Sequence, residues 1–504
     1  MSGGWWAVAA VLAVVVATIA IGAFGVRVSR TTQDFLVASR SVSPTLNASA
    51  IGGEYLSAAS FLGIAGLVLS YGVDMLWFPV GYTVGYLVLL LLVAGPLRRS
   101  GAYTLPDFAE MRLGSQRLRL VSSVLVVLIG WLYLLPQLQG AGITLHALTG
   151  APTWVGAAVV AVVVGITVVA GGMRSITVVQ AFQYWLKLLA IALPAVLIVA
   201  FWFHDGSPVF ADGDWGTPLS GYGGREYPLY ATYSIVLATF LGTMGLPHVL
   251  VRFYTNPDGR AARRTTVAVL LLLSVFYLFP PMFGALGRVY TPQLAGTPEA
   301  DTVVLVLPGA VFPGALGTAL SALVAAGAFA AFLSTASGLS VSVAGVLSQD
   351  VLSRTKRLGD GVRRFRLGTL VAVLVPLLLA LVAGRTDIAE TVTLAFAVAA
   401  STFCPLLVLG IWWPRLTVRG ATAALVVGGT TALGAVVAVL AFGPLTGVLG
   451  ALLGQPAAWT VPLAFATAIG VSLVTRDRVP RTTPAALAQL HAPEALDLRG
   501  DVRR

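Results

Sequence analysis

The 504-residue sequence has little of what soluble enzymes and secreted domains depend on. It contains one cysteine and four histidines, and Asp, Glu, Lys and Arg together make up only 10% of the chain. A single cysteine, Cys404, excludes an internal disulfide and a thiolate metal cluster. There is also no HExxH motif, no P-loop and no pair of catalytic carboxylates. These absences argue against an enzyme and against a pump driven by ATP.

Apolar residues dominate what is present. Hydrophobic residues make up 57% of the chain, which is more than one soluble core could bury, so lipid is the expected solvent for most of it. The net charge of +11 does not indicate a nucleic-acid partner, because the basic residues lie in short loops and form no continuous stripe. The first residues, MSGGWW, lack a basic segment and lead into an apolar run, which predicts a retained first span.

A membrane-spanning helix needs about 20 mainly apolar residues. Runs of this kind predict about thirteen transmembrane helices. They lie near residues 5–25, 45–70, 74–96, 120–148, 152–171, 175–203, 229–250, 266–287, 310–347, 367–384, 389–411, 420–442 and 457–475. The run at 310–347 is too long for one perpendicular helix, which predicts a tilted or re-entrant portion on the outer side.

The distribution of basic residues predicts the orientation, because Lys and Arg resist export. Nearly all of the 31 basic residues, Arg252 among them, fall in one set of alternate loops. The opposite set holds Arg225, Arg288 and Arg385, and Lys187 lies within a span. We therefore expect an odd number of spans in a bacterial-type inner (plasma) membrane, with the N-terminus outside and the C-terminus in the cytoplasm.

Two apolar spans are interrupted, and irregular backbone at membrane depth survives only where it lines a cavity or is buried in protein. They are ASAIGGEYLSAASFLGIAG at 48–66 and LATFLGTMGLPHVLVRF at 237–253. Their glycines predict helix breaks, with close helix packing as the alternative. The candidate substrate or coupling residues of these segments are Gly52, Glu54, Tyr55, Gly242, Gly245 and His248.

If the first span is peripheral, the interrupted spans are the first and sixth helices of a ten-helix core. That spacing predicts two five-helix repeats, of which the second is inverted in the membrane. The predicted parts are 1–44 (first helix and cytoplasmic loop), 45–203 (first repeat), 204–228 (extracellular loop), 229–411 (second repeat), 412–478 (two further helices) and 479–504 (cytoplasmic tail).

Glu54 and Lys187 are the charged residues that we expect deep within spans, where each costs about 2.5–3.5 kcal/mol on the insertion scale. Glu54 is either a cation or proton site or a structural ion pair. Lys187 could pair with Glu54, meet a carboxylate substrate or extend toward the membrane surface. For His248, a structural role near the cytoplasmic end stays open beside a role in coupling.

A third polar segment, AAFLSTASGLSVS at 330–342, sets Ala331, Ser334, Thr335 and Ser337 within about one and a half helical turns. Hydroxyl and carbonyl oxygens are the hard ligands that an alkali ion requires. Hydroxyls also join membrane helices to one another, so the segment alone does not specify an ion site.

With these segments the sequence resembles the sodium:solute symporter family, and within it the cation/acetate symporters and related monocarboxylate carriers. The most specific stretches are GEYLSAASFLGIAG at 53–66, GTMGLPHVLVRFYT at 242–255 and FLSTASGLSVSVAGVLSQDVLS at 332–353. YTLPDFAEMRL at 103–113 and GGMRSITVVQ at 171–180 add to it. The resemblance implies an all-α, polytopic fold of the leucine-transporter type, with a 5+5 inverted-repeat core, broken first and sixth core helices and alternating access.

The resemblance also implies a sodium site between the first and eighth core helices. Its ligands would be the backbone carbonyls of Gly53, Leu56 and Ala331 and the hydroxyls of Ser334 and Thr335. Gly53 departs from the alanine of some members, and some acetate-type relatives have no hydroxyl opposite Ser334 and Thr335. The coupling ion could therefore differ among close relatives.

The favoured hypothesis is a secondary symporter that couples sodium or a proton to the uptake of acetate, propionate or pyruvate, with no cofactor besides the ion. We expect the substrate between the two breaks, where half-helix N-termini favour a carboxylate. The alternatives are a symporter of an amino acid or sugar, and a passive channel or uniporter. A channel needs no ion site, so the hydroxyl cluster and the paired breaks argue against it. The oligomeric state stays open.

Overall fold

The computed structural model describes residues 3–26, 38, 41–210, 213–221, 226–354, 360–382, 388–443 and 445–492. Within them, eleven helical runs are long and apolar enough to cross a membrane. Two of these runs contain two crossings each. The 52 residues of Thr153–His204 would extend about 78 Å, against about 30 Å of hydrocarbon, and the run is kinked at Gly172 (φ 55°). The run Ala59–Leu92 turns at Gly72 (φ 78°). The prediction of about thirteen transmembrane helices is therefore confirmed.

The helices of the first repeat follow the peripheral helix α1 (Gly3–Val26). They are α3 (Pro44–Tyr55) with η2 (Ala59–Gly63) and α4 (Ile64–Tyr71), then α5 (Trp77–Leu92), α8 (Gln116–Thr149) and the two halves of α9 (Thr153–His204). The second repeat consists of α10 (Pro228–Gly242) with α11 (Pro247–Val251), α12 (Gly259–Phe276) with α13 (Phe279–Tyr290), α15 (Ala315–Val346), α16 (Gly361–Val382) and α17 (Ile388–Trp412). Outside the core lie α18 (Val418–Phe442) and α20 (Ala457–Val474). Short helices α6 (Ala94–Arg99), α7 (Leu105–Leu113), α14 (Val303–Val311), α19 (Gly447–Gly454) and α21 (Thr483–His491) connect or cap them.

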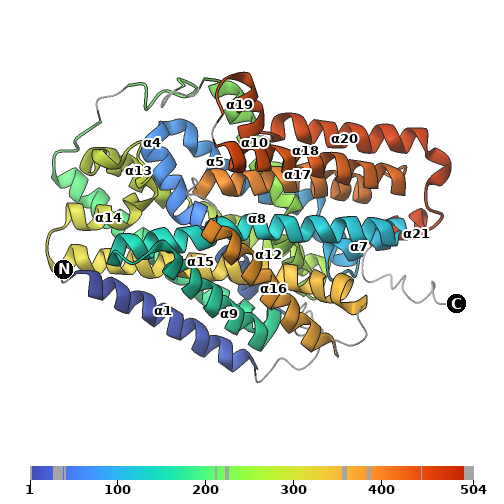
Figure 1. The fold of residues 1–504 in the computed structure, drawn as a ribbon, viewed down its shortest axis with the longest axis horizontal. Coiled ribbons are helices and arrows are strands. Elements are labelled where there is room, and N and C mark those ends of the chain that lie inside the picture. The colour runs from blue at the N-terminus through green and yellow to red at the C-terminus, as the bar shows by residue number, and fades with distance from the viewer. Residues whose placement is uncertain are drawn as a thin grey trace.

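Interrupted helices from both repeats meet at the centre of the bundle. α9 packs against α3, α15, α8 and α1, while α10 packs against α17 and α5. Figure 1 shows α8, α15, α18 and α20 running roughly across the view, with the start of α1 at one end and α21 at the other. This is the predicted leucine-transporter-type arrangement, with breaks in the first and sixth core helices.

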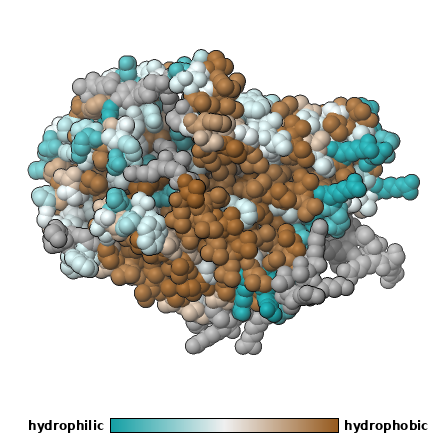
Figure 2. Space-filling view, viewed as in Figure 1, coloured by the Kyte–Doolittle hydropathy of each residue, from teal (hydrophilic) through white to brown (hydrophobic). Residues whose placement is uncertain are grey.

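The surface carries a broad apolar belt between two more polar ends (Figure 2). Among the described residues, large apolar side chains such as Leu91, Val162, Leu271 and Leu378 are more than half exposed. Exposed apolar side chains in this number are what a lipid-facing surface requires, because no water-soluble protein leaves so large an apolar area uncovered.

The apolar run at 310–347 is divided between two helices. α14 ends at Val311 and α15 begins at Ala315, with Gly314 at φ 79° between them, a conformation that glycine adopts without strain. The helix from Ala315 to Val351 is 37 residues long, or about 55 Å, so it extends beyond a perpendicular crossing. Arg225 and Arg385, two of the predicted outer basic residues, lie outside the described residues.

Candidate cation and substrate site

The first core helix stops at Tyr55 and restarts at Ala58. Leu56 lies between the two segments with φ −73° and ψ 85°, which is outside the helical range. The amide of Ala58, at the start of the second segment, donates to Oε1 of Gln137 at 2.9 Å. A side chain of α8 thus takes up one of the amides that the break leaves without a helical partner.

The sixth core helix is broken in the same way. α10 ends at Gly242, a single 3₁₀ turn (Thr243–Gly245) follows, and Leu246 is extended at ψ 115°. Pro247 starts the next helical segment, a position where its missing amide has no cost. The predicted pair of broken helices is therefore present.

The residues that leave helical geometry at the two breaks are Leu56 and Leu246 and not glycines, which corrects the expectation that the chain unwinds at the glycines. Gly52 and Gly53 are helical, and Gly242 and Gly245 precede the extended residue. A Cβ on Gly53 would lie 2.1 Å from a backbone oxygen of α9, and one on Gly245 would lie 2.3 Å from a backbone oxygen of α17. The alternative reading of close helix packing applies to these residues, and the breaks follow them.

Lys187, on the second half of α9, reaches the end of α3. Its side chain is fully buried, and Nζ donates to the carbonyl oxygens of Gly53 at 2.5 Å and Leu56 at 2.7 Å and to Oγ of Ser334 at 3.1 Å. The two carbonyls lie where α3 ends and helical hydrogen bonds stop. An ammonium group has three donors and no acceptor, so every donor of Lys187 has an oxygen.

The amine takes the position that the family resemblance assigns to sodium. Three of the five predicted ligands bond to Nζ of Lys187. The Ser334 hydroxyl donates to the carbonyl of Ala331 at 3.0 Å, and the Thr335 hydroxyl donates to the carbonyl of Glu54 at 2.6 Å. The structure thus brings the five predicted residues together, but three of them surround a side chain of the protein. None of the three roles considered for Lys187 from the sequence describes this arrangement.

Glu54 is paired with Arg252. Nε of Arg252 lies 2.5 Å from Oε2 of Glu54, and the two side chains are 0% and 2% exposed. The other guanidinium donors bond to Oγ1 of Thr177 at 2.8 Å and to Oε1 of Gln180. The assignment of Arg252 to a cytoplasmic loop is therefore wrong. It lies in the buried 3₁₀ segment η5 (Arg252–Thr255), because a carboxylate buried in the bundle needs a charged and hydrogen-bonded partner.

An aromatic region fills the space between Tyr55 and the sixth core helix. We use this name for Tyr55, Tyr86, Tyr133, His248 and Phe396. The ring centroids of Tyr55 and Tyr86 are 4.7 Å apart, those of Tyr133 and Phe396 are 5.8 Å apart, and those of Tyr133 and His248 are 5.1 Å apart. All five side chains are buried. The rings come from α3, α5, α8, α11 and α17, so both repeats contribute.

Polar atoms in the aromatic region are left without partners. The hydroxyl of Tyr86 and both ring nitrogens of His248 have no hydrogen-bond partner among the described residues. The Tyr55 hydroxyl, by contrast, lies 2.9 Å from Oγ1 of Thr243 and so joins the two broken helices. Buried donors without partners are costly and rare in folded proteins, so this region is a candidate ligand site.

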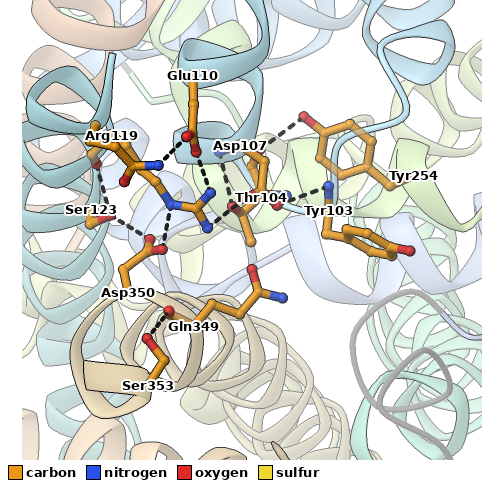
Figure 3. Close-up of polar contacts among 11 residues, drawn as sticks. Tyr103, Thr104, Asp107, Glu110, Arg119, Ser123, Tyr254, Gln349, Asp350 and Ser353 are labelled. Carbon is orange, nitrogen blue, oxygen red and sulfur yellow. Dashed lines mark hydrogen bonds and ion pairs between the residues drawn. The ribbon is translucent and has the colours of Figure 1, made fainter. Parts of the chain in front are cut away.

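A second charged cluster lies at the end of the bundle that holds α7 and the start of α8. Figure 3 shows Arg119 directed at three carboxylates, with nitrogen–oxygen distances of 2.7 Å to Asp107, 2.5 Å to Glu110 and 2.6 Å to Asp350. Ser123 donates to Asp350 at 2.5 Å. Burial raises the pKa of the Asp107 carboxyl above its usual value, and the Arg119 guanidinium opposes this shift. The cluster ties α8 of the first repeat to η8 (Leu347–Val351), the segment that follows α15.

Sequence reasoning missed Arg252, Gln180 and Tyr86. A signal for Arg252 was present, since it is the nearest charged residue after the second break and Glu54 needs a partner. Gln180 lies in the family-like stretch at 171–180, and its Nε2 donates to the carbonyl of Ser334 at 2.7 Å. For Tyr86 there was no comparable signal, because an aromatic residue within a span is usually a packing residue.

A model of the sodium:solute symporter family matches residues 35–428 of the chain. The chain belongs to this family. A symporter of Bacillus subtilis, named as uncharacterized symporter YwcA, is 33% identical over 421 residues, which cover 81% of this chain and 82% of that protein. The monocarboxylic acid transporter of Corynebacterium glutamicum is 32% identical over 440 residues, with 81% and 79% covered. The protein is thus a multi-pass secondary symporter and not an enzyme.

Two solved structures show the same fold. A Na⁺-coupled sialic acid symporter in a substrate-bound outward-open state aligns with a TM-score of 0.68 and 16% identity, and 92% of this chain and 98% of that one are covered. A nucleobase-cation-symport-1 family transporter with bromovinylhydantoin bound aligns with a TM-score of 0.55 and 16% identity, with 90% and 98% covered. At this identity the likeness concerns the fold alone.

Proposed function

We propose that this symporter couples inward movement of a cation, sodium or a proton, to the uptake of a small monocarboxylate such as acetate, propionate or pyruvate. The observation that carries the proposal is the aromatic region, where the Tyr86 hydroxyl and the His248 ring lie buried without hydrogen-bond partners among the described residues. A carboxylate accepts hydrogen bonds from both kinds of group. The surrounding rings suit a methyl, ethyl or acetyl tail.

Charge supports an anionic substrate. Glu54 and Arg252 cancel each other as a buried pair, and the Lys187 ammonium adds one positive charge beside the same break. A charge buried without a counter-ion is costly, so a monocarboxylate bound next to the break would lower this cost. A neutral sugar would not lower the cost of this buried charge.

The named relatives support the same substrate class. The Corynebacterium glutamicum protein is called a monocarboxylic acid transporter, and it matches this chain over most of both lengths. We place the substrate between Leu56 and Leu246, against the aromatic region. The packed glycines Gly52, Gly242 and Gly245 then hold the walls of the site in position rather than bind the substrate.

We further propose an inner (plasma) membrane location, with the N-terminus outside and the C-terminus in the cytoplasm. The concentration of Lys and Arg in one set of loops supports this orientation. The start of α1 and the helix α21 lie at opposite ends of the bundle (Figure 1), as an odd number of crossings requires.

Counterflow in proteoliposomes tests the substrate. Vesicles loaded with unlabelled pyruvate should accumulate labelled pyruvate transiently, and external acetate and propionate should compete, whereas proline and glucose should not. Competition in the reverse order would contradict the monocarboxylate assignment. A channel or uniporter would give a pyruvate flux that no cation gradient accelerates, so net uptake is measured with imposed sodium and proton gradients as well.

A further inference from the structure

The residues around the α3 break do not fit a sodium ion as the family resemblance implies. Nζ of Lys187 lies within hydrogen-bond distance of Gly53, Leu56 and Ser334, so it stands inside the set of oxygens that would surround the ion. A cation and an ammonium group cannot occupy the same position, and side by side they would repel strongly at this depth.

We infer that the Lys187 ammonium is a tethered cation that replaces sodium at this position, so that the site binds no sodium and a sodium gradient does not drive transport through it. This inference deepens the proposed function by excluding one of its two coupling ions at that site. It does not depend on the substrate, because it concerns the oxygens of α3 and α15 alone.

The hydrogen bonding supports a permanent occupant. Each of the three donors of the ammonium group has one oxygen acceptor, and two of these are carbonyls at the negatively polarised C-terminus of α3. Ser334 directs its own proton to the carbonyl of Ala331, which leaves an oxygen lone pair for the amine. A sodium ion bound to these oxygens would have to displace the amine, which would lose all three of these hydrogen bonds.

Neighbouring charged and titratable groups leave the amine in place. On α3 the nearest is Glu54, whose carboxylate is held by Arg252 of η5. α15 presents the hydroxyls of Ser334 and Thr335. On α9 itself, one turn before Lys187, the Tyr184 hydroxyl donates to the carbonyl of Leu272 at 3.0 Å. Lys187 therefore supplies to the end of α3 the positive charge that sodium supplies in a sodium-dependent symporter.

Thermal unfolding of the purified, detergent-solubilised protein tests the inference without reference to any substrate. The parent should unfold at the same temperature in sodium chloride and in potassium chloride of equal concentration. Lys187→Ala removes the amine and leaves the three oxygens that it contacted facing a cavity, so its unfolding temperature should rise in sodium but not in potassium, by mass action. Leu189→Ala, a truncation at a 53% exposed position on the same helix, should show no such difference.

A sodium-specific rise in the parent would overturn the inference, whether or not Lys187→Ala folds. Transport supplies the second measurement. Labelled pyruvate uptake by the parent should be unchanged by an inward sodium gradient, whereas Lys187→Ala should gain a sodium-dependent increase in initial rate. Uptake by the parent that follows the sodium gradient would also overturn it. If the parent showed no pyruvate counterflow at all, the proposed substrate would be wrong, and the thermal measurement would still decide the occupant of the site.

Discussion

Two regions flank the break in the first core helix, and they differ in how completely their polar atoms are bonded. Around Lys187 every ammonium donor has an oxygen, supplied by Gly53, Leu56 and Ser334. In the aromatic region the Tyr86 hydroxyl and the His248 ring have no partner among the described residues. A buried site in which every donor is bonded suits a permanent occupant. A buried site with donors that lack partners suits a ligand that binds and is released during transport. The break in the first core helix thus lies between a position held by a side chain of the protein and a candidate site for the substrate.

The largest expected effect comes from the buried ion pair. Arg252→Met leaves the Glu54 carboxylate buried and unpaired, which should cost about 3–5 kcal/mol of unfolding free energy. Thermal unfolding in detergent measures this as a lower unfolding temperature. In the double variant with Glu54→Gln neither position of the pair carries a charge, so most of the lost stability should return.

Arg119→Met is the matched comparison, since it also removes an arginine that binds carboxylates. The Arg119 side chain is 21% exposed, and two of its carboxylates, Asp107 and Glu110, are 14% and 28% exposed and can regain water, so a smaller loss is expected. If Arg252→Met costs no more than Arg119→Met, the ion pair of Glu54 and Arg252 does not have the structural importance assigned to it.

The second effect concerns the aromatic region and should appear in affinity, not in stability. Tyr86→Phe removes a hydroxyl that has no partner in the structure, so the unfolding temperature should hardly change. A hydrogen bond to a carboxylate contributes about 1.5–3 kcal/mol, so the half-saturating pyruvate concentration should rise about ten- to hundredfold. Initial uptake rates over a range of pyruvate concentrations measure it.

Tyr184→Phe provides the opposite control. The Tyr184 hydroxyl donates to the carbonyl of Leu272 and does not belong to the aromatic region, so its loss should lower stability by about 0.5–1.5 kcal/mol and leave pyruvate affinity unchanged. An unchanged affinity in Tyr86→Phe together with an unchanged affinity in His248→Ala would place the substrate elsewhere.

The third effect concerns the hydroxyls of Ser334 and Thr335 on α15. In the parent, Ser334→Ala removes one acceptor from the Lys187 ammonium and Thr335→Ala removes a bond to the Glu54 carbonyl, each at about 1 kcal/mol of stability and with no change in sodium response. In the Lys187→Ala background, both should raise the half-saturating sodium concentration. A sodium response in the parent that both substitutions weaken would restore the sodium assignment.

Much of the helical architecture followed from apolar run length, because lipid imposes the same length on every crossing. The two broken helices were also predictable, since Gly and Pro cluster there. The residues at which the two helices break could not be predicted. Gly53 and Gly245 are needed where α9 and α17 approach most closely, and this requirement comes from packing partners more than a hundred residues away. Local sequence shows that glycine is present but not which neighbour requires it.

The site was harder to predict, for a related reason. The residues that resemble the sodium ligands do meet, but the direction of Lys187 depends on how α9 rotates after its kink at Gly172. The sequence predicts Arg252 in a cytoplasmic loop, because a charge normally marks the membrane surface. Its guanidinium is neutralised by Glu54, so the helical segment continues through it into the buried core. Pairing across the two repeats is a tertiary property that hydropathy along one segment does not contain.

The smallest expected effect lies at the end of the bundle, where charged groups are neither fully buried nor beside the break. Asp107 accepts the Thr104 amide at 3.1 Å and pairs with Arg119, yet its burial raises its pKa above the usual 3.8. The folded state therefore binds this proton more tightly than the unfolded state does. The stability that the protonated form contributes is complete below pH 3.8 and is lost as the pH rises through the higher pKa of the folded state.

Asp107→Asn keeps an oxygen for the helix cap and does not titrate. The unfolding temperature of the parent minus that of Asp107→Asn should thus fall as the pH rises, by an amount equivalent to about 1 kcal/mol or less at this 14% exposed side chain. A difference that grows with pH would mean that Arg119 outweighs burial, and that this cluster belongs with the fully bonded region around Lys187.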